Sequence, residues 1–188
     1  MEEIIMSEHK KKIEAVFLDR DGTIGGDDTI HYPGSFELYP YTQEIINHLR
    51  KQGIKILSFT NQPGIARGKA TKQEFIDELL EFGFDEVFIC PHSHTEGCKC
   101  RKPGTEMLME GAKKHSLNLE NCVVIGDRWS DMVAAAKVNC IKILVTTGAG
   151  QSSLTEHFEK IKNLNIEYVA KDLEDAIAWM GQHFDMNN

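Results

Sequence analysis

The chain has 188 residues, of which 41% are hydrophobic and 27% are charged. That length and composition are typical of one globular domain that is large enough to bury a single core. There are 21 lysines and arginines against 29 aspartates and glutamates, which gives a formal net charge of -8. This charge argues against a nucleic acid or an anionic membrane as partner, although it is compatible with a local basic pocket.

The N-terminal segment carries acidic residues before its lysines and contains no long apolar run. It therefore resembles neither a signal peptide nor a membrane span, and we predict a cytoplasmic protein. We expect residues 1–12 to form a flexible segment and residues 13–188 to form one domain.

Short apolar runs recur along the chain, with helix-like segments between them. In chain order, these predicted buried strands span residues 13–18, 54–59, 86–90, 122–126 and 140–145. Strands that are nearly continuous in apolar residues and alternate with helices are typical of a parallel sheet covered by helices on both faces. The sequence therefore predicts an α/β fold with a doubly wound parallel sheet.

Three of the intervening segments carry recognisable helix starts. Thr71 and Glu74 form a capping box before an apolar stripe. Pro103 suits the first turn of another helix, because its missing N–H would be unpaired there anyway. Asp172 can cap the last helix, whose apolar stripe consists of Leu173, Ile177, Met180 and Phe184.

Two segments lack a regular pattern. Residues 25–40 are rich in Gly, Asp, Tyr and Pro and should form a long loop, and residues 91–101 should form a second irregular insert. Neither segment is long enough to fold as a separate cap domain. We therefore expect a comparatively open site that is shaped by loops.

The candidate site consists of the polar residues that follow each apolar run, because ligands of a doubly wound sheet bind beyond the carboxyl ends of its strands. Taken singly, such residues could be ordinary turns or helix caps. Their recurrence at four successive strand ends favours a catalytic site. In chain order they are Asp19 and Asp21, Thr60 and Asn61, Arg101 and Lys102, and Asp127 and Arg128.

Asp19 and Asp21 lie two residues apart at the end of a strand, so both carboxylates should point to the same side. One carboxylate can then attack while the other manages a proton. Asp19 as nucleophile would form an acyl phosphate, which splits one hard displacement into two easier ones. Asp21 would protonate the departing alkoxide and later deprotonate the attacking water.

An anionic nucleophile and an anionic phosphate repel each other, so such a site needs positive charge. Mg²⁺ would supply it if the cation were bound by the carboxylates of Asp19 and Asp127 and by the backbone carbonyl of Asp21. Lys102 and the hydroxyl of Thr60 would hold the remaining phosphate oxygens.

Three further residues belong to this predicted site. We expect Asn61 and Gln62 to contact the substrate, with backbone amides around Asn61 donating to phosphate oxygens. Asp131 follows Asp127 by four residues and should orient either the water shell of the metal or Lys102.

The residues at the strand ends resemble the four sequence motifs of the haloacid dehalogenase superfamily. The resemblance spans roughly residues 13–150 and implies a phosphatase with a Rossmann-like core. It extends to a subfamily of small phosphatases that is marked by a zinc-binding loop. The matching segments are DRDGT (19–23), TNQPGIARG (60–68), CRKPG (100–104) and GDRWSDM (126–132), and the subfamily marker is CPHSHTEGCKCRKP (90–103).

The marker segment offers Cys90, His92, Cys98 and Cys100 as ligands of a tetrahedral zinc site. The resemblance implies the same four ligands. A site with four protein ligands has no open position, so the zinc would be structural and would stiffen the loop before the predicted catalytic lysine. His94 is a competing ligand, and a disulfide is the alternative that a reducing compartment disfavours.

The substrate is less well defined by the sequence. The subfamily includes D-glycero-D-manno-heptose 1,7-bisphosphate 7-phosphatase, which the IARG segment favours, and histidinol-phosphate phosphatase, which the short Cys90 to Cys98 spacing favours. Arg67, Arg101 and Arg128 could bind a second anionic group of a bisphosphate, because arginine forks suit phosphate oxygens. Arg67 could equally be an ordinary solvated side chain.

Three other functions compete with a phosphatase acting on a small phosphorylated metabolite. A polynucleotide 3'-phosphatase would suit an open site, but the net charge argues against it. A non-enzymatic receiver-like module would keep its phosphoryl group, whereas Asp21 should hasten hydrolysis. A zinc-organised nucleic-acid binder would need more basic charge near the cysteines.

Overall fold

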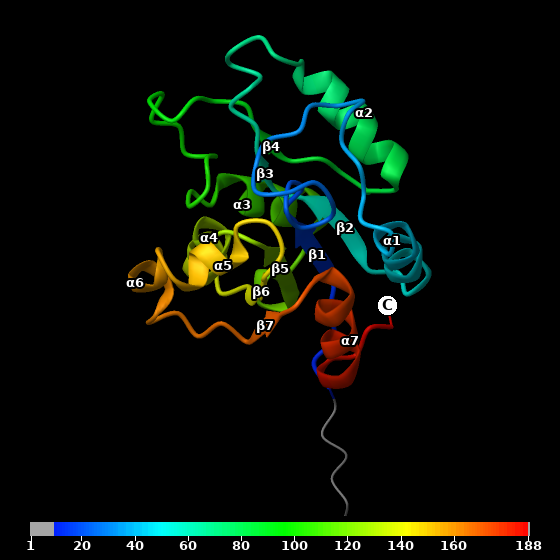
Figure 1. Cartoon of the computed structure of the whole chain (residues 1–188). Coiled ribbons are helices and arrows are strands. Elements are labelled where there is room, and N and C mark those ends of the chain that lie inside the picture. The colour runs from blue at the N-terminus through cyan, green and yellow to red at the C-terminus, as the bar shows by residue number, and fades with distance from the viewer. Residues whose placement is uncertain (1–9, 188) are drawn as a thin grey trace, which may run out of the picture.

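The computed structural model describes residues 10–187, and its core is a five-stranded sheet in which all the neighbouring strands are parallel (Figure 1). The strand order is β2-β1-β5-β6-β7. Strand β2 lies on one side of β1 and the later strands lie on the other side, so the strand order reverses between β1 and β5. A crevice at that reversal is where ligands bind in doubly wound sheets. The strands are β1 (Ala15–Leu18), β2 (Lys55–Ser58), β5 (Cys122–Gly126), β6 (Ile141–Val145) and β7 (Tyr168–Ala170).

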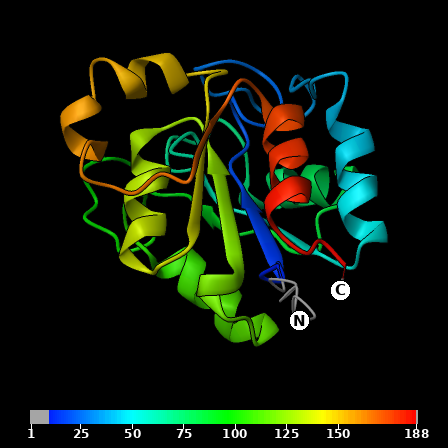
Figure 2. The same ribbon diagram turned by 90° about the horizontal axis from the view of Figure 1, so that it is seen from below.

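Helices cover both faces of the sheet, because side chains alternate between the faces along each strand (Figure 2). Val16 and Leu18 of β1 pack in one apolar cluster with α1 (Thr42–Lys51) and α7 (Leu173–His183). Phe17 packs in the other cluster. That second face is covered by α3 (Glu106–His115) and α4 (Trp129–Lys137). The short helices α5 (Gly150–Leu154) and α6 (Phe158–Ile161) lie against α4. The 3-10 turn η1 (Leu119–Asn121) directly precedes β5. The predicted α/β fold is confirmed.

The predicted strand over residues 86–90 is shorter than expected. Only β4 (Ile89–Cys90) forms, and it pairs with β3 (Thr60–Asn61) in a separate two-stranded sheet. The Ser58 hydroxyl explains the gap, since it donates to the Phe88 carbonyl at 3.0 Å and accepts from the Phe88 amide at 2.8 Å. The hydroxyl thus replaces the ladder partner of the Phe88 amide, while the Ser58 amide still donates to the Glu86 carbonyl at 3.0 Å.

Two of the three predicted helix starts are confirmed. Helix α2 (Lys72–Phe82) begins at the capping box, in which the Glu74 amide donates to Thr71 Oγ1 at 3.2 Å and the Thr71 amide donates to Glu74 Oε2 at 2.6 Å. Asp172 caps α7 by accepting from the Asp175 amide at 2.9 Å.

The helix start predicted at Pro103 is wrong. Helix α3 begins at Glu106, and Pro103 instead lies in a turn after a cis peptide bond. The amide of Gly104 donates to the carbonyl of Arg101 at 2.7 Å, so the backbone here closes a turn before the helix can begin. Strand β7 was not predicted, because its three residues are too short a run to stand out.

Neither segment that was predicted to be irregular folds into a separate cap domain. Residues 25–40 remain a loop that is fastened by a bridge between Gly25 and Leu38, and residues 91–101 contain no helix or strand. The predicted flexible segment 1–12 lies outside the described residues except for its end, where Lys12 bridges Asp185. Within the described part of the chain, no helix is both long and apolar enough to cross a membrane.

Candidate active site

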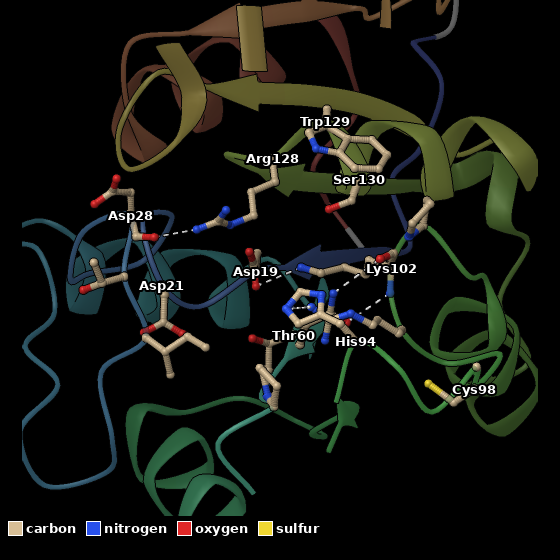
Figure 3. Close-up of a pocket in the computed structure, with 17 residues that line it drawn as sticks. Asp19, Asp21, Asp28, Thr60, His94, Cys98, Lys102, Arg128, Trp129 and Ser130 are labelled. Atoms are coloured by element: carbon tan, nitrogen blue, oxygen red, sulfur yellow. Dashed lines mark hydrogen bonds and ion pairs between the residues drawn. The ribbon is translucent and has the colours of Figure 1, made fainter. Parts of the chain in front are cut away.

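Most of the predicted catalytic and substrate-binding residues line one cavity of about 660 Å³ at the carboxyl end of the sheet, whereas Gln62, Arg67 and Asp127 are not among the described lining residues (Figure 3). Asp19 directly follows β1, Asp127 directly follows β5, and Lys102 comes from the turn before α3. The parallel arrangement of the strands is what brings these segments to one edge. The lining residues are Asp19, Asp21, Asp28, Thr29, Ile30, Thr60, Asn61, Pro63, His94, Gly97, Cys98, Arg101, Lys102, Pro103, Arg128, Trp129 and Ser130.

Lys102 places a buried ammonium group between two carboxylates. Its Nζ lies 3.0 Å from Asp19 Oδ1 and 2.7 Å from Asp131 Oδ1, and it donates to the Phe59 carbonyl at 2.8 Å. Burial alone would lower the pKa of Lys102, but Asp131 and Asp19 outweigh that effect and raise it above the ordinary value. The lysine is therefore a fixed positive charge beside Asp19.

Asp19, Asp127 and Asp131 form a buried acidic cluster in which one ligand atom of each residue lies within 4.8 Å of the others. Burial, together with Asp19 and Asp131, raises the pKa of Asp127 well above its ordinary value. Burial also raises the pKa of Asp131 to about 6, despite the neighbouring Lys102. If all three acids were ionised, one lysine would not balance them, which is why burial and mutual repulsion favour the protonated form of Asp127.

The carboxylate of Asp127 is only partly satisfied by the protein. Its Oδ2 accepts from the Ala149 amide at 2.7 Å. Its Oδ1 is buried and has no hydrogen-bond partner among the described residues. An unpaired buried carboxylate oxygen is costly, and a bound cation would relieve that cost. The oxygen ligands of this cluster could therefore hold a hard divalent metal ion.

Two glycines allow the backbone to approach this carboxylate. Gly22 has a φ of +82°, which favours glycine, and a Cβ at this position would overlap the Asp127 carboxylate. A Cβ on Gly148 would meet the same carboxylate and the backbone of Gly22. The glycine in the DGT segment is thus required by the packing around Asp127.

The Asp21 carboxylate accepts hydrogen bonds at both of its oxygens. Oδ1 accepts from Arg20 Nη1 at 2.8 Å and from the His31 amide at 3.0 Å, and Oδ2 accepts from Gln62 Nε2 at 2.7 Å. Burial raises the pKa of Asp21, and this effect is larger than the lowering by Arg20. A raised pKa suits a carboxyl group that must donate a proton near neutral pH.

Thr60, Asn61 and Gln62, which follow β2, differ in their exposure to the cavity and in their hydrogen-bond partners. Thr60 is buried, lines the cavity and accepts from Gln62 Nε2 at 3.0 Å. Asn61 also lines the cavity, but its Oδ1 accepts from the Lys102 amide at 3.0 Å and so ties the turn before α3 to β3. Gln62 is fully buried and is not among the described residues that line the cavity, so its amide contacts Asp21 and Thr60 instead.

The three predicted anion-binding arginines differ in position. Arg128 lines the cavity and donates from Nη2 to the Asp28 carbonyl at 2.6 Å, which joins the loop 25–40 to the start of α4. Arg101 also lines the cavity, where its Nη2 lies 3.0 Å from His94 Nε2. Arg67 is exposed and is not among the described lining residues, although its charge contributes, after Arg101 and burial, to lowering the pKa of His94.

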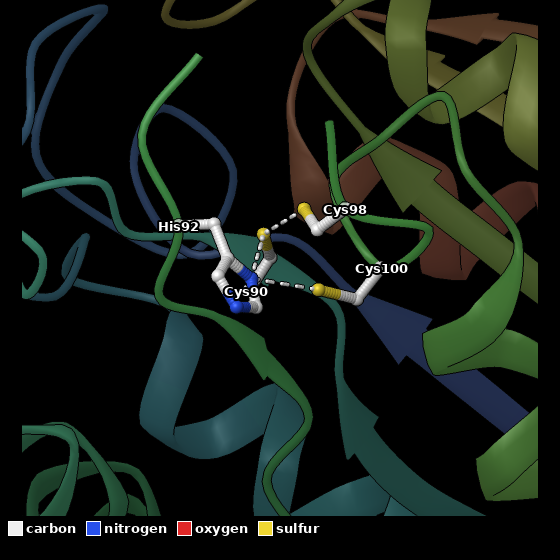
Figure 4. Close-up of side chains that lie close together, drawn as sticks. All are labelled: Cys90, His92, Cys98 and Cys100. Atoms are coloured by element: carbon white, nitrogen blue, oxygen red, sulfur yellow. Dashed lines mark hydrogen bonds between the residues drawn. The ribbon is translucent and has the colours of Figure 1, made fainter. Parts of the chain in front are cut away.

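The predicted zinc ligands meet in the second irregular insert (Figure 4). Cys90, His92, Cys98 and Cys100 each offer a ligand atom within 4.8 Å of the others, and all the cysteines are free thiols. Cys90 Sγ lies 3.6 Å from Cys98 Sγ, and His92 Nδ1 lies 3.2 Å from Cys100 Sγ. The competing candidate His94 faces Arg101 in the cavity instead, so the four-residue set is the one that could hold a metal.

Some lining residues were missed by the sequence analysis. Asp28, Thr29 and Ile30 belong to the loop 25–40, and Trp129 and Ser130 begin α4. The loop residues have no motif, and only the length of the loop pointed to a function. Trp129 and Ser130 could have been found from their place shortly after Asp127 at a strand end.

Comparison with known proteins agrees with this geometry. The HAD-hydrolase-like family model matches residues 99–176. The D-glycero-beta-D-manno-heptose-1,7-bisphosphate 7-phosphatase of Helicobacter pylori strain J99 is 35% identical over 178 residues, which cover 89% of this chain and 97% of the relative. The protein of the same name from Escherichia coli K12 is 34% identical over 157 residues, which cover 73% of this chain and 82% of the relative.

Solved structures with the same fold include another enzyme of this kind. The D,D-heptose 1,7-bisphosphate phosphatase from B. bronchiseptica, crystallised with magnesium and phosphate, superposes with a TM-score of 0.77 at 28% identity. The match covers 90% of this chain and 99% of that chain. This chain therefore belongs to the haloacid dehalogenase superfamily and, within it, to the phosphatase subfamily that includes D-glycero-D-manno-heptose 1,7-bisphosphate 7-phosphatase.

Proposed function

We propose that this phosphatase is Mg²⁺-dependent and removes the 7-phosphate of D-glycero-D-manno-heptose 1,7-bisphosphate through an aspartyl-phosphate intermediate. The observation that carries the proposal is the meeting of Asp19, Asp21 and Lys102 beside a buried acidic cluster in one cavity. The relative from Helicobacter pylori J99, which aligns with this chain over 97% of its own length at 35% identity, carries that substrate in its name. The enzyme would act on this small metabolite in the cytoplasm, with neither a nucleic acid nor a membrane as partner.

In the first step, a carboxylate oxygen of Asp19 attacks phosphorus and the bond to the sugar oxygen breaks. Asp21 gives its proton to the departing alkoxide. In the second step, Asp21 takes a proton from water, the water oxygen attacks phosphorus, and the bond to Asp19 breaks. Inorganic phosphate leaves and both acids return to their starting state. Lys102 and the Thr60 hydroxyl hold the phosphate oxygens throughout.

The residues present fit a magnesium ion. The carboxylates of Asp19 and Asp127 and the backbone carbonyl of Asp21 would hold it, and the unpaired Asp127 Oδ1 supports this assignment. When bound, the ion neutralises phosphate charge and polarises the phosphoryl group. Asp131 orients Lys102, since its Oδ1 lies 2.7 Å from the ammonium and its Oδ2 accepts from the Arg128 amide at 2.9 Å.

The Cys90, His92, Cys98 and Cys100 cluster would hold a structural zinc ion. Four protein ligands fill a tetrahedral site, so no position is left for a substrate or a catalytic water. The cluster surrounds the segment that carries Arg101, whose Nη1 donates to the His92 carbonyl at 3.4 Å. The zinc would thus fix the insert that delivers Arg101 and Lys102 to the cavity.

The second phosphate of the substrate would bind at Arg101 and Arg128, because both line the cavity and guanidinium groups bind phosphate oxygens in pairs. We propose that Asn61 acts through its backbone amide and by anchoring Lys102, and that Gln62 acts through Asp21. Histidinol phosphate is the second candidate substrate, but it has no second phosphate for the two arginines.

The test is phosphate release by the purified chain from heptose 1,7-bisphosphate and from histidinol phosphate, with Mg²⁺ or with a chelator. We expect release from the bisphosphate with Mg²⁺, little release from histidinol phosphate, and no release by Asp19→Asn. Activity that survives Asp19→Asn would refute the mechanism, and a preference for histidinol phosphate would refute the substrate.

A further inference from the structure

Arg20 is the largest fully buried side chain in the described part of the chain, and no step of the proposed mechanism uses it. Its exposed fraction is 0%, so its charge must be compensated by the protein. The guanidinium carbon lies 3.6 Å from the ring centre of Phe36 and 5.1 Å from that of Phe75. An arginine clamped in this way between two rings has little freedom to move.

The guanidinium divides its donors between two acids and one loop. Nε and Nη2 donate to Glu78 Oε2 at 3.1 and 2.6 Å. Nη1 donates to Asp21 Oδ1 at 2.8 Å and to the His31 carbonyl at 2.7 Å. The ion pair with Glu78 therefore holds one side of the fork and aims the other side at Asp21.

This arrangement makes the two oxygens of Asp21 different. A carboxylate oxygen has about two lone pairs. Those of Oδ1 are occupied by Arg20 Nη1 and the His31 amide, whereas Oδ2 accepts only from Gln62 among the described residues. Oδ2 can thus carry a proton and still accept from Gln62. The contacts fix the rotation of the carboxyl group and leave Oδ2 as the oxygen with fewer donors.

Glu78 connects this arrangement to the rest of the molecule. It lies on α2, which runs beside the loop 25–40 (Figure 1). Its Oε1 accepts from the Gly34 amide at 3.1 Å, while Arg20 contacts the same loop at His31. Helix α2 and the loop are therefore joined to Asp21 through one buried guanidinium.

We propose that Arg20, anchored by Glu78, is a positioning residue that orients Asp21 for proton transfer to the leaving group. It acts through Asp21 and not on the substrate, since it is fully buried and is not among the described residues that line the cavity. The proposal rests on the proposed role of Asp21 as the acid and base of the reaction.

The dependence on the leaving group tests this role. An alkyl phosphate needs a proton on its departing oxygen, whereas p-nitrophenyl phosphate leaves as a stable phenolate without one. First-turnover rates of both substrates would be measured with Mg²⁺ for the native chain, Asp21→Asn, Arg20→Lys and Glu78→Gln. Glu78→Gln is nearly isosteric, so it is available if the lysine variant does not fold.

We expect Glu78→Gln and Arg20→Lys to slow the alkyl substrate by about tenfold or more, since positioned acid catalysis contributes at least that much. The first-turnover rate with p-nitrophenyl phosphate should change much less, and KM should stay within about twofold. Asp21→Asn should shift the ratio of the two rates in the same direction.

Glu167→Gln is the matched control. Glu167 pairs with the buried Lys142 at 3.1 Å on β6, so its loss disturbs a comparable ion pair at a residue that is not among those lining the cavity. We expect the ratio of rates to stay unchanged in this variant.

The outcomes distinguish a failure of the role of Asp21 from a failure of the role of Arg20. If Asp21→Asn leaves the ratio unchanged, the role of Asp21 fails and the role of Arg20 fails with it. If Asp21→Asn shifts the ratio but folded Glu78→Gln and Arg20→Lys slow both substrates equally or not at all, Arg20 has only a structural role and the present proposal is overturned.

Discussion

At the scale of single residues, the site is dominated by charges that are buried together. Lys102 lies between Asp19 and Asp131, whereas Asp127, the third acid of the cluster, forms no ion pair with a described residue. Removing one partner of a buried ion pair usually costs about 3 to 5 kcal/mol, because the other charge is left uncompensated. Stability and catalysis at this site should therefore respond to the same substitutions.

Replacing Lys102 with methionine should abolish most of the activity and lower the stability. The variant leaves three buried carboxylates without the ammonium, so we expect unfolding free energy to fall by about 3 kcal/mol and kcat to fall at least about a hundredfold. Denaturant titration and phosphate release would measure both. Lys142→Met is the control, because it removes another buried lysine and should leave kcat within about twofold. Near-native activity of Lys102→Met would contradict the role of Lys102 in holding the phosphate.

The raised pKa values of the acidic cluster predict how magnesium changes stability with pH. Burial raises the pKa of Asp131 to about 6 and that of Asp127 well above its ordinary value. The folded chain thus holds protons that the unfolded chain releases near pH 4, so the metal-free protein loses stability as pH rises from about 4 through these folded-state values. If Mg²⁺ binds the deprotonated acids, as proposed, it would offset this loss.

We therefore expect the increase in Tm caused by Mg²⁺ to be small near pH 5 and to grow towards about pH 8. Thermal unfolding with Mg²⁺ and with EDTA across this range would measure it. An increase in Tm that does not change with pH would contradict binding at the cluster. Asp127→Asn should weaken the effect.

At the scale of elements, the sheet and the two irregular segments have different origins. The strands at 13–18 and 122–126 could be predicted because all their residues except Glu14 are buried, which leaves a near-continuous apolar run in the sequence. The run at 86–90 looked the same, but the Phe88 amide donates to the Ser58 hydroxyl instead of a strand carbonyl, which interrupts the ladder. No apolar pattern reveals such a contact between distant residues.

In the site, too, residues at strand ends could be predicted from the sequence, whereas contacts between distant residues could not. Asp19, Asp21, Lys102 and Asp127 could be located because each follows a strand or its insert, and parallel strands end at one edge. The role of Arg20 could not be predicted, because its partner Glu78 lies 58 positions away in the chain. Its burial depends on how α2 and the loop 25–40 pack, which the sequence pattern does not encode.

The Cys90 cluster gives a prediction for the second insert. Cys98→Ser should reduce zinc from about one ion per chain and loosen residues 91–101, because a structural zinc contributes folding energy to its loop. We expect lower kcat and faster proteolysis within this insert. Cys140→Ala is the matched control, since this buried cysteine lies outside the cluster. An unchanged zinc content in Cys98→Ser would contradict the assignment of Cys98 as a zinc ligand.

At the scale of the whole molecule, the chain carries a net charge of -8 but gathers Arg101, Arg128 and Lys102 in the lining of one cavity. A net negative charge disfavours nucleic acids as partners, while these three cations lie beside Asp19, Asp21 and Asp28 in the same lining and could contact a small anion. Arg101 lies in the insert and Arg128 directly before α4, so the spacing of the two phosphates in the proposed substrate would have to match a distance that only the folded molecule defines.

This arrangement predicts a selective effect of Arg128→Gln. The variant should raise KM for the heptose bisphosphate by about tenfold or more, which corresponds to one lost charge-assisted pair. It should change KM for a monophosphate substrate much less. Arg67→Gln is the comparison, because Arg67 is exposed and should have a smaller effect. Equal changes for both substrates would contradict a second phosphate site at Arg128.

The most direct test of the central claim is to locate the phosphoryl group on the protein. Asp21→Asn would be mixed with p-nitrophenyl phosphate and Mg²⁺, quenched in acid and analysed by mass spectrometry, with Asp19→Asn combined with Asp21→Asn as control. The first step needs no proton with this substrate, while the second step lacks its base, so a phosphorylated peptide containing Asp19 should accumulate and be absent from the double variant. Phosphorylation at another residue, or burst-free turnover with no phosphorylated protein, would contradict the account.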